Sequence, residues 1–344
     1  MTDLYVIDVS AVVHTAESSK GFSDRTYYNY PVGGIHLLMK YVAIAFSRRD
    51  HVVLCFDSPT KKKAVLPGYK GGRSFNANVI SQLEVLYSGL SSCGIRCEKF
   101  ENTEADDVVD WAVKQNLNDY DEIIIIGNDY DLCHSVQAKV RFKAINPSMN
   151  SIYRGNFETG IERGVYIPFN MISAYKVFCG CHSDKIPAFH LSNGLSGKKL
   201  FDRFVEFFRE RDLPDTYECT SGWESVYLFV RESGLFNESE QQEALVRISL
   251  IYPDECPEGV VIQPTDPVFV NEKKLAHFLS LYNDYDSLRC LQLQKVYLSE
   301  EDKELLRTAS RKLTSGEFAA DNNVEMHSKI KNTTLTLDAF SKDF

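Results

Sequence analysis

The chain lacks the features that mark several classes of protein. Its nine cysteines form no paired framework, so we expect reduced thiols in place of a disulfide-stapled scaffold. No apolar run approaches the ~20 residues of a membrane-spanning helix, and we expect no membrane association. Positive charge is also scarce: 48 acidic against 38 basic residues give a net charge of -10. This balance argues against a protein that coats nucleic acid through bulk positive charge, although it leaves room for a local basic track.

The composition that remains is that of an ordinary globular protein. With 344 residues, 44% of them hydrophobic, the chain exceeds what one core usually organises. It therefore predicts one large domain with appendages, or two domains. A strand-like segment begins at Asp3 without a signal-peptide pattern, and we expect a cytoplasmic protein. The run from Cys179 to His182 has too few ligands for a structural zinc site.

Three apolar, β-branched segments each lead into an acidic residue. They are Tyr5 to Asp8, Val52 to Asp57, and Ile123 to Ile126 followed by Asn128 and Asp129. Such runs are typical of strands buried on both faces of a parallel sheet. Helical patterns separate them, at about 33–48, 76–93 and 104–115.

This alternation predicts a doubly wound α/β domain, in which the carboxyl ends of the strands meet at one edge. Ligands bind at that edge in open α/β sheets.

From about residue 165 the pattern becomes almost purely helical. We expect helices near 168–178, 198–211, 223–233, 240–251 and 272–282. We assign residues 1–180 to the core, 181–318 to a helical C-terminal region, and the polar segment 319–344 to a flexible tail.

Acidic residues gather where this topology brings the strands together. Seven carboxylates are expected at the carboxyl edge: Asp8, Asp57, Glu104, Asp106, Asp107, Asp129 and Asp131. Each one alone could cap a turn or a helix. Together they would repel strongly without positive partners, and hard divalent cations are the natural partners of carboxylate oxygens. The cluster predicts a site for Mg²⁺ or Mn²⁺.

These residues resemble the ordered motifs of the 5'-3' exonuclease and flap endonuclease family. The motifs are Val6-Ile7-Asp8, Phe56-Asp57, Tyr69-Lys70-Gly71-Gly72-Arg73, Glu104-Ala105-Asp106-Asp107, Asn128-Asp129-Tyr130-Asp131 and Ser183-Asp184-Lys185-Ile186-Pro187. The bacteriophage RNase H and 5'-exonuclease enzymes look nearest, over about residues 4–200. The resemblance implies an α/β, PIN-like parallel-sheet nuclease core. It also implies a short helical arch at about 60–95, a helix-hairpin-helix-like element and a helical C-terminal region.

The resemblance also assigns roles to the carboxylates. It implies that Asp8, Asp57, Glu104, Asp106 and Asp107 surround one metal ion, that Asp129 and Asp131 lie between two ions, and that Asp184 lies at the second. The chain departs from the family pattern where Cys181 replaces an acid and Lys185 replaces an asparagine. Because a thiol is a poor Mg²⁺ ligand, we expect the second metal site to be weakened.

A basic track precedes the arch. Between residues 58 and 83 the chain carries five bases and no acid: Lys61, Lys62, Lys63, Lys70 and Arg73. We expect Tyr69, Lys70 and Arg73 to share one side of a helix, where the ring would stack on a base and the cations would hold phosphate. The resemblance implies that Lys70 and Arg73 stabilise the transferring phosphate. A solvated loop is the alternative for Lys61 to Lys63.

Three further segments have DNA- or protein-binding interpretations. Gly194, Ser196, Lys198 and Lys199 resemble a degenerate helix-hairpin-helix turn, which would contact a duplex phosphate and hold K⁺; an ordinary helix start is the alternative. The aromatic run 27–30 could wedge against a terminal base pair or simply pack a loop. Residues 334–340 loosely resemble a clamp-binding peptide, or a tail strand packed on its own domain.

These features lead to a functional expectation. We expect a monomeric, structure-specific 5' nuclease that cleaves DNA flaps, nicks and ends, and RNA-DNA hybrids, with two Mg²⁺ ions for which Mn²⁺ could substitute. Asp8, Asp107, Asp129 and Asp131 would carry the chemistry, and primer removal in replication, in a bacteriophage within host cytoplasm, would be the role. A sliding clamp and a single-strand-binding protein are the expected partners. The alternatives are a non-catalytic or weakened DNA-junction binder, a PIN-type ribonuclease and, least favoured, a haloacid dehalogenase phosphatase, for which Ser10 stands where a second Asp is needed.

Overall fold

A computed structural model gives the fold of most of the chain. It describes residues 2–66, 68–70, 76–145, 160–162, 165–167, 171–182, 184–210 and 222–293. Arg73 and the segment 319–344, including the expected clamp-binding residues 334–340, lie outside the described residues. Among the described helices, none has both the length and the apolar character needed to cross a membrane.

A five-stranded, entirely parallel sheet forms the centre of the molecule, as the apolar runs predicted. Its spatial order is β5-β4-β1-β6-β7. The strands are β1 (Leu4–Asp8), β4 (His51–Cys55), β5 (Cys97–Glu98), β6 (Ile123–Gly127) and β7 (Val140–Ala144). The register pairs Ile7 with Leu54 on one side and with Ile126 on the other. The three predicted apolar strands are therefore the three central ones, and their carboxyl ends lie at the same edge.

Alternate residues of the strands point into two separate cores. Leu4 and Val6 of β1 belong to one core, whereas Tyr5 and Ile7 belong to the other. Because side chains alternate across a strand, a strand buried on both faces must be apolar throughout. All five residues of β1 and of β6 are buried, which confirms this interpretation of the sequence.

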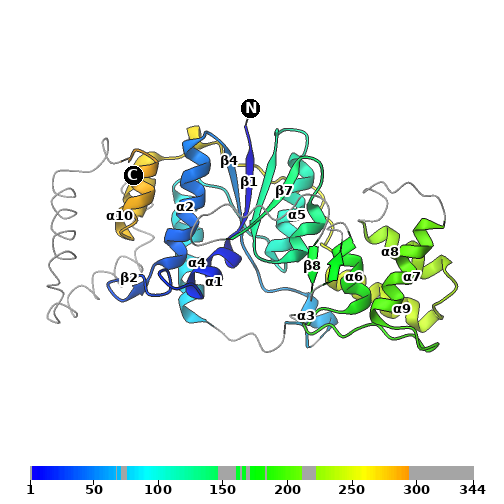
Figure 1. The fold of residues 1–344 in the computed structure, drawn as a ribbon. Helices are drawn as coiled ribbons and strands as arrows, with labels where there is room; N and C mark the ends of the chain where they lie inside the picture. The colour runs from blue at the N-terminus through cyan, green and yellow to red at the C-terminus, as the bar shows by residue number, and fades with distance from the viewer. Residues whose placement is uncertain are drawn as a thin grey trace, which may run out of the picture.

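Helices cover both faces of the sheet (Figure 1). One face packs against α1 (Val9–Glu17), α2 (Gly33–Ser47), α4 (Ala77–Ser92), α10 (Glu272–Leu281) and α11 (Tyr285–Cys290). The other packs against α5 (Ala105–Asn116), whose core continues into α6 (Ile172–Cys179), α7 (Gly197–Arg209), α8 (Trp223–Glu232) and α9 (Glu238–Ile251). The α/β class and the predicted helices are confirmed, with boundaries shifted by a few residues.

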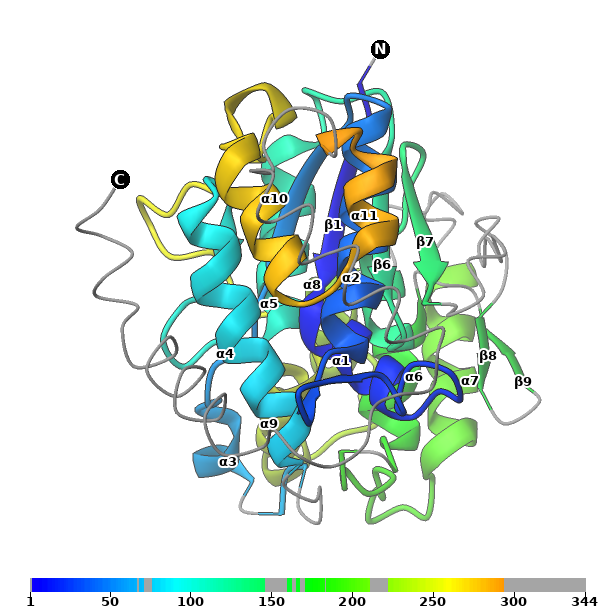
Figure 2. The same ribbon diagram turned by 90° about the vertical axis from the view of Figure 1, so that its left-hand side faces the viewer.

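The carboxyl edge of the sheet lies at the lower end of the molecule in Figure 2, opposite the amino terminus. Several short elements surround it. They are α3 (Lys62–Val65), the 3-10 helix η1 (Tyr130–Ser135), and the two-stranded pairs β2 (Thr26–Tyr27) with β3 (Tyr30–Pro31) and β8 (Gly160–Glu162) with β9 (Val165–Ile167). A second 3-10 helix, η3 (Pro267–Phe269), precedes α10. Sequence patterns did not predict these elements because each is too short to show a hydrophobic period.

Candidate active site at the carboxyl edge of the sheet

Four carboxylates meet where the central strands end. Asp8 closes β1 and caps α1, its Oδ1 accepting a hydrogen bond from the Ala11 amide at 2.9 Å. Asp57 follows β4 and accepts from the Ala105 amide at 2.8 Å, which ties it to the first turn of α5. Asp106 lies in that turn and Asp129 follows β6. Helix capping explains their local conformations, but the parallel sheet is what brings them together.

The pKa values of this group report an excess of negative charge. Burial raises the pKa of Asp8 to about 7, and the charges of Asp57 and Asp129 add to the increase. Burial also raises the pKa of Asp106 well above its ordinary value, with further increases from Asp129 and Asp8. Carboxylates that raise one another's pKa in this way lie close together without enough positive charge among them. Carboxylate oxygens are the ligands that a divalent cation prefers, although among the described residues no group of three or more His, Cys, Asp and Glu side chains is arranged so that it could hold a metal ion.

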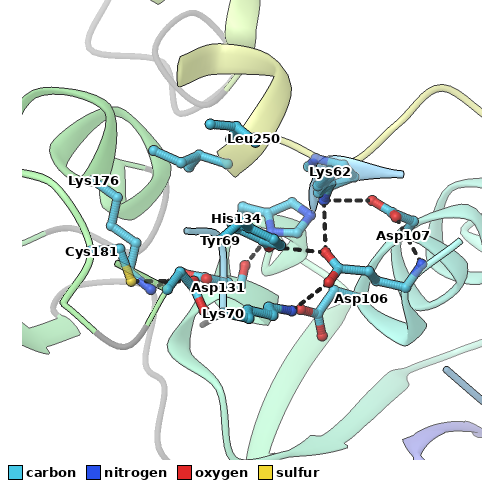
Figure 3. Close-up of a pocket in the computed structure, with 14 residues that line it drawn as sticks. Lys62, Tyr69, Lys70, Asp106, Asp107, Asp131, His134, Lys176, Cys181 and Leu250 are labelled. Carbon is cyan, nitrogen blue, oxygen red and sulfur yellow. Dashed lines mark hydrogen bonds and ion pairs between the residues drawn. The ribbon is translucent and has the colours of Figure 1, made fainter. Parts of the chain in front are cut away.

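Glu104 and Asp107 have partners of a different kind. They form a capping box at the start of α5, in which Asp107 Oδ2 accepts from the Glu104 amide at 3.2 Å. The ammonium of Lys62 lies 3.0 Å from Glu104 Oε2 and 3.6 Å from Asp107 Oδ1, and that of Lys70 lies 2.6 Å from Glu104 Oε1. Although burial alone would raise the pKa of Glu104, the two lysines lower it. The two lysines therefore compensate for the charge of Glu104, whereas burial raises the pKa of Asp107 although Lys62, paired with it in Figure 3, opposes the increase.

The basic track differs from the sequence expectation. Lys62 is only 5% exposed, and Tyr69 is 3% exposed with its hydroxyl donating to Glu104 Oε2 at 3.1 Å. Lys70 does not continue a helix but lies in a turn with φ +50°. Both side chains are buried against Glu104, and the phosphate contact of Lys62 and the base stacking of Tyr69 stay predictions. Lys63 is exposed as expected.

Asp131 and Asp184, the remaining predicted metal ligands, lie on the other side of the pocket. The ammonium of Lys176 contacts Asp131 Oδ1 and lies 3.8 Å from Asp129 Oδ1. Burial raises the pKa of Asp131 to about 6 even though Lys176 opposes the increase. The thiol of Cys181 donates to Asp184 Oδ2 at 3.3 Å. Figure 3 places Lys176 and Cys181 opposite Lys62 and Asp107.

Two positively charged or polar groups near Asp131 were not predicted. Lys176 lies within the apolar helix α6, and its isolation among apolar neighbours was a sequence signal for a buried ion pair. His134 Nε2 lies 3.2 Å from Asp110 Oδ1, which also accepts from Ser135 Oγ at 3.0 Å. Burial disfavours the charged imidazole, but Asp110 raises the pKa of His134. No motif signals this pair, because its members come from separate elements.

The candidate hairpin precedes α7. The Gly194 amide donates to the Leu191 carbonyl at 3.0 Å, and Gly194 has φ +85°, a conformation that favours glycine. Lys198 and Lys199 are exposed at the start of α7, where Lys198 also pairs with Asp202 at 2.7 Å. A tight turn followed by two exposed cations is thus present at the predicted position.

The aromatic run after α1 forms a hairpin. Tyr27 pairs with Tyr30 across β2 and β3, and the turn residues Tyr28 and Asn29 have positive φ. Tyr28 is 39% exposed, whereas Tyr30 packs against Tyr282. The structure therefore gives packing as the role of Tyr30.

Comparison with known proteins identifies the N-terminal part of the chain. Residues 3–159 match the family model of the 5'-3' exonuclease N-terminal resolvase-like domain. Residues 3–159 are therefore similar to the N-terminal domain of 5'-3' exonucleases. The matched residues include all seven carboxylates expected at the carboxyl edge as well as Lys62 and Lys70. Asp184, Lys176 and Cys181 lie beyond the matched residues.

The exonuclease domain also aligns with a longer protein. DNA polymerase I of Caldicellulosiruptor bescii is 25% identical over 176 residues, which are 50% of this chain and 20% of the polymerase. The chain thus spans about a fifth of the length of this relative.

Solved structures resemble the chain as well. The bacteriophage T5 D15 flap endonuclease in complex with DNA and metal ions has a TM-score of 0.49 at 13% identity, over 84% of this chain and 99% of its own. Human GEN1 with Holliday junction DNA has a TM-score of 0.47 at 13% identity, over 84% and 71%.

Proposed function

We propose that this chain is a structure-specific 5' nuclease that hydrolyses phosphodiesters near 5' ends of DNA with the help of a divalent cation. The proposal is supported by the match of residues 3–159 to the 5'-3' exonuclease N-terminal domain. The single observation that carries it is the group of Asp8, Asp57, Asp106 and Asp129, in which burial and mutual repulsion raise the pKa values of Asp8 and Asp106. Such a pocket is stabilised by a bound cation.

Each residue of the pocket has a role that follows from its contacts. Asp8, Asp106 and Asp129 would supply ligand oxygens, and Asp57, tied to the Ala105 amide, would hold α5 against them. A divalent cation at this position would activate water and offset charge on the attacked phosphodiester. Lys70 lowers the pKa values of Asp8 and Asp106 and adds positive charge at the pocket.

Exposed cations outside the pocket suit the DNA backbone. Lys63, in α3, and Lys198 and Lys199, at the start of α7, lie on segments that flank the carboxyl edge and the adjoining helices. Their exposed ammonium groups could contact phosphates and fix the distance between the duplex and the carboxylates. Arg73 keeps its proposed role in holding the transferring phosphate on the strength of the sequence motif.

A labelled 5'-flap duplex with Mg²⁺ tests the proposal. We expect the full-length chain to release a short 5' product, and Asp129→Asn to lower the rate at least ~100-fold while flap binding persists, because the charge of a metal ligand is lost. Asp119→Asn is the matched control, since Asp119 is an exposed acid just beyond the far end of α5. Equal rates in the wild type and Asp129→Asn would refute the proposal.

A non-catalytic junction binder is the second candidate. It is favoured by the lysines that form ion pairs with Glu104, Asp107 and Asp131. A binder would hold the flap tightly in both the presence and absence of Mg²⁺ and would not cleave it. The same flap assay distinguishes this candidate, because the nuclease forms product only with the cation.

The finer features of the function are proposals of the same kind. We propose Mg²⁺ as the working ion, with Mn²⁺ as a substitute, and RNA-DNA hybrids as further substrates in primer removal. A sliding clamp contacting residues 334–340 remains the proposed partner. Deleting residues 332–344 should lower clamp-stimulated cleavage and leave basal cleavage intact, whereas loss of basal cleavage would contradict this proposal.

A further inference from the structure

One cation of the protein itself lies among the predicted metal ligands. Lys176 projects from α6 toward η1, with a side chain that is 7% exposed. Its ammonium contacts Asp131 Oδ1 and lies 3.8 Å from Asp129 Oδ1. A buried ammonium is stable only when carboxylates compensate for its lost hydration. The two acids that would lie between two metal ions therefore already share one positive charge.

The turn that contains Cys181 and Asp184 is also poorly suited to a second metal ion. Cys181 is 3% exposed, and its thiol donates a hydrogen bond to Asp184 Oδ2 at 3.3 Å. The sequence thus supplies a neutral hydrogen-bond donor at position 181, where the family pattern has an acid. The main-chain carbonyl of Asp184 accepts from the Lys70 amide at 3.1 Å, which fixes this turn against the basic segment. These donors do not fit a second site for a hard cation.

The first position has the opposite character. Asp8 ends β1, and Asp106 lies in the first turn of α5, which packs against β1. The ammonium of Lys70 is engaged by Glu104 at 2.6 Å. On this side of the pocket, the negative charge of the carboxylates exceeds the positive charge of the side chains around them. On the other side, Lys176 supplies a fixed positive charge, so the two positions differ in their need for a metal ion.

We propose that Lys176 takes the place of the second divalent cation, so that this nuclease works with a single divalent ion at the Asp8 position. The inference rests on the proposed nuclease function and deepens it. A +2 ion beside Asp131 would meet the Lys176 ammonium at close range, and the repulsion would disfavour its binding. Cys181 completes the substitution, because it removes the carboxylate that would compensate for a second ion.

Counting Mn²⁺ ions tests this directly. Electron paramagnetic resonance of free Mn²⁺ during titration of the full-length protein should give one bound ion per chain for the wild type. The double variant Lys176→Met with Cys181→Asp should bind two, because it removes the ammonium and adds a carboxylate. Arg203→Met is the matched control, since it removes an exposed cation paired with Glu206 on α7, and it should bind one ion.

Substrate could bring an ion of its own, so the same variants are compared during flap cleavage. The logarithm of the rate against the logarithm of subsaturating Mg²⁺ concentration should have a slope near 1 for the wild type and near 2 for the double variant. Two Mn²⁺ ions bound by the wild type, or a wild-type slope near 2, would overturn the proposal. Unchanged stoichiometry in a folded double variant would overturn it as well.

The outcomes separate this inference from the proposed function. If the double variant does not fold, Lys176→Arg, which keeps the positive charge, should still bind one Mn²⁺ ion, and a second bound ion would count against the proposal. A wild type that binds one ion but never cleaves a flap would defeat the nuclease function alone. A wild type that cleaves with two ions would defeat only the single-ion inference.

Discussion

The ion pair of Lys62 makes the sharpest prediction about the architecture of the pocket. We consider Lys62→Met, which keeps the aliphatic stem and removes the ammonium. In the folded protein Lys62 bridges Glu104 at 3.0 Å and Asp107 at 3.6 Å, and the three side chains are 7%, 6% and 2% exposed. The substitution therefore leaves two buried acids with less compensating charge.

The size of the effect follows from these distances. At an effective dielectric constant of about 20, charges 3 to 4 Å apart attract by about 4 to 6 kcal/mol per contact, before the cost of burying them is subtracted. Removing one partner of a buried pair typically costs about 3–5 kcal/mol. Glu104 retains Lys70 and Tyr69, so we expect a loss near the lower limit, ~3 kcal/mol in the free energy of unfolding at pH 7.

Urea denaturation followed by circular dichroism measures this loss. The control is Arg203→Met, which breaks the exposed pair with Glu206 and should change the free energy of unfolding by at most ~0.5 kcal/mol. Combining Lys62→Met with Asp107→Asn should recover part of the stability, because the uncompensated charge is gone. A loss below ~1 kcal/mol for Lys62→Met would show that the acids do not depend on Lys62, and the reasoning would fail.

Three further predictions concern the core, acid stability and metal removal. Phe204→Ala should cost ~3–5 kcal/mol of unfolding free energy by thermal denaturation, since Phe204 is fully buried and packs against Phe178 and Phe229; a small loss would contradict this packing. Burial would raise the pKa of Asp110, but His134 and Lys114 lower it to about 2 from an ordinary 3.8. Because the pKa of Asp110 is lower in the folded than in the unfolded state, Asp110 should contribute ~2 kcal/mol to the free energy of unfolding above pH 4. This contribution should be lost as the pH falls from 4 to 2. Urea titrations of Asp110→Asn should therefore show a weaker dependence of stability on acid pH. Chelation with EDTA should stop flap cleavage and added Mg²⁺ should restore it, whereas cleavage in EDTA would exclude a metal-dependent nuclease.

Much of the fold could be predicted from sequence because its signals are local. The strands β1, β4 and β6 are buried on both faces, so each is an unbroken apolar run that stands out in the sequence. The α5 helix begins at a capping box whose two acids are three positions apart in the chain. In contrast, β5 has only two residues and belongs to the sheet solely through its pairing with β4, so no local pattern could identify it.

The candidate site likewise has one feature that the sequence predicts and another that only the tertiary structure shows. By itself, the sequence determined that Asp8, Asp57 and Asp129 would follow strands that end at one edge, because the strands of a parallel sheet do so whatever their side chains do. It predicted seven carboxylates at that edge without distinguishing among them. Only the tertiary structure decided which acids carry uncompensated charge and which are neutralised. Lys62 reaches Glu104 across 42 positions and Lys176 reaches Asp131 across 45, and these pairings depend on how α3 and α6 pack against the edge. The attraction between two charges weakens with their distance in space and does not depend on their separation along the chain. The roles of these lysines could therefore be assigned only from the folded structure.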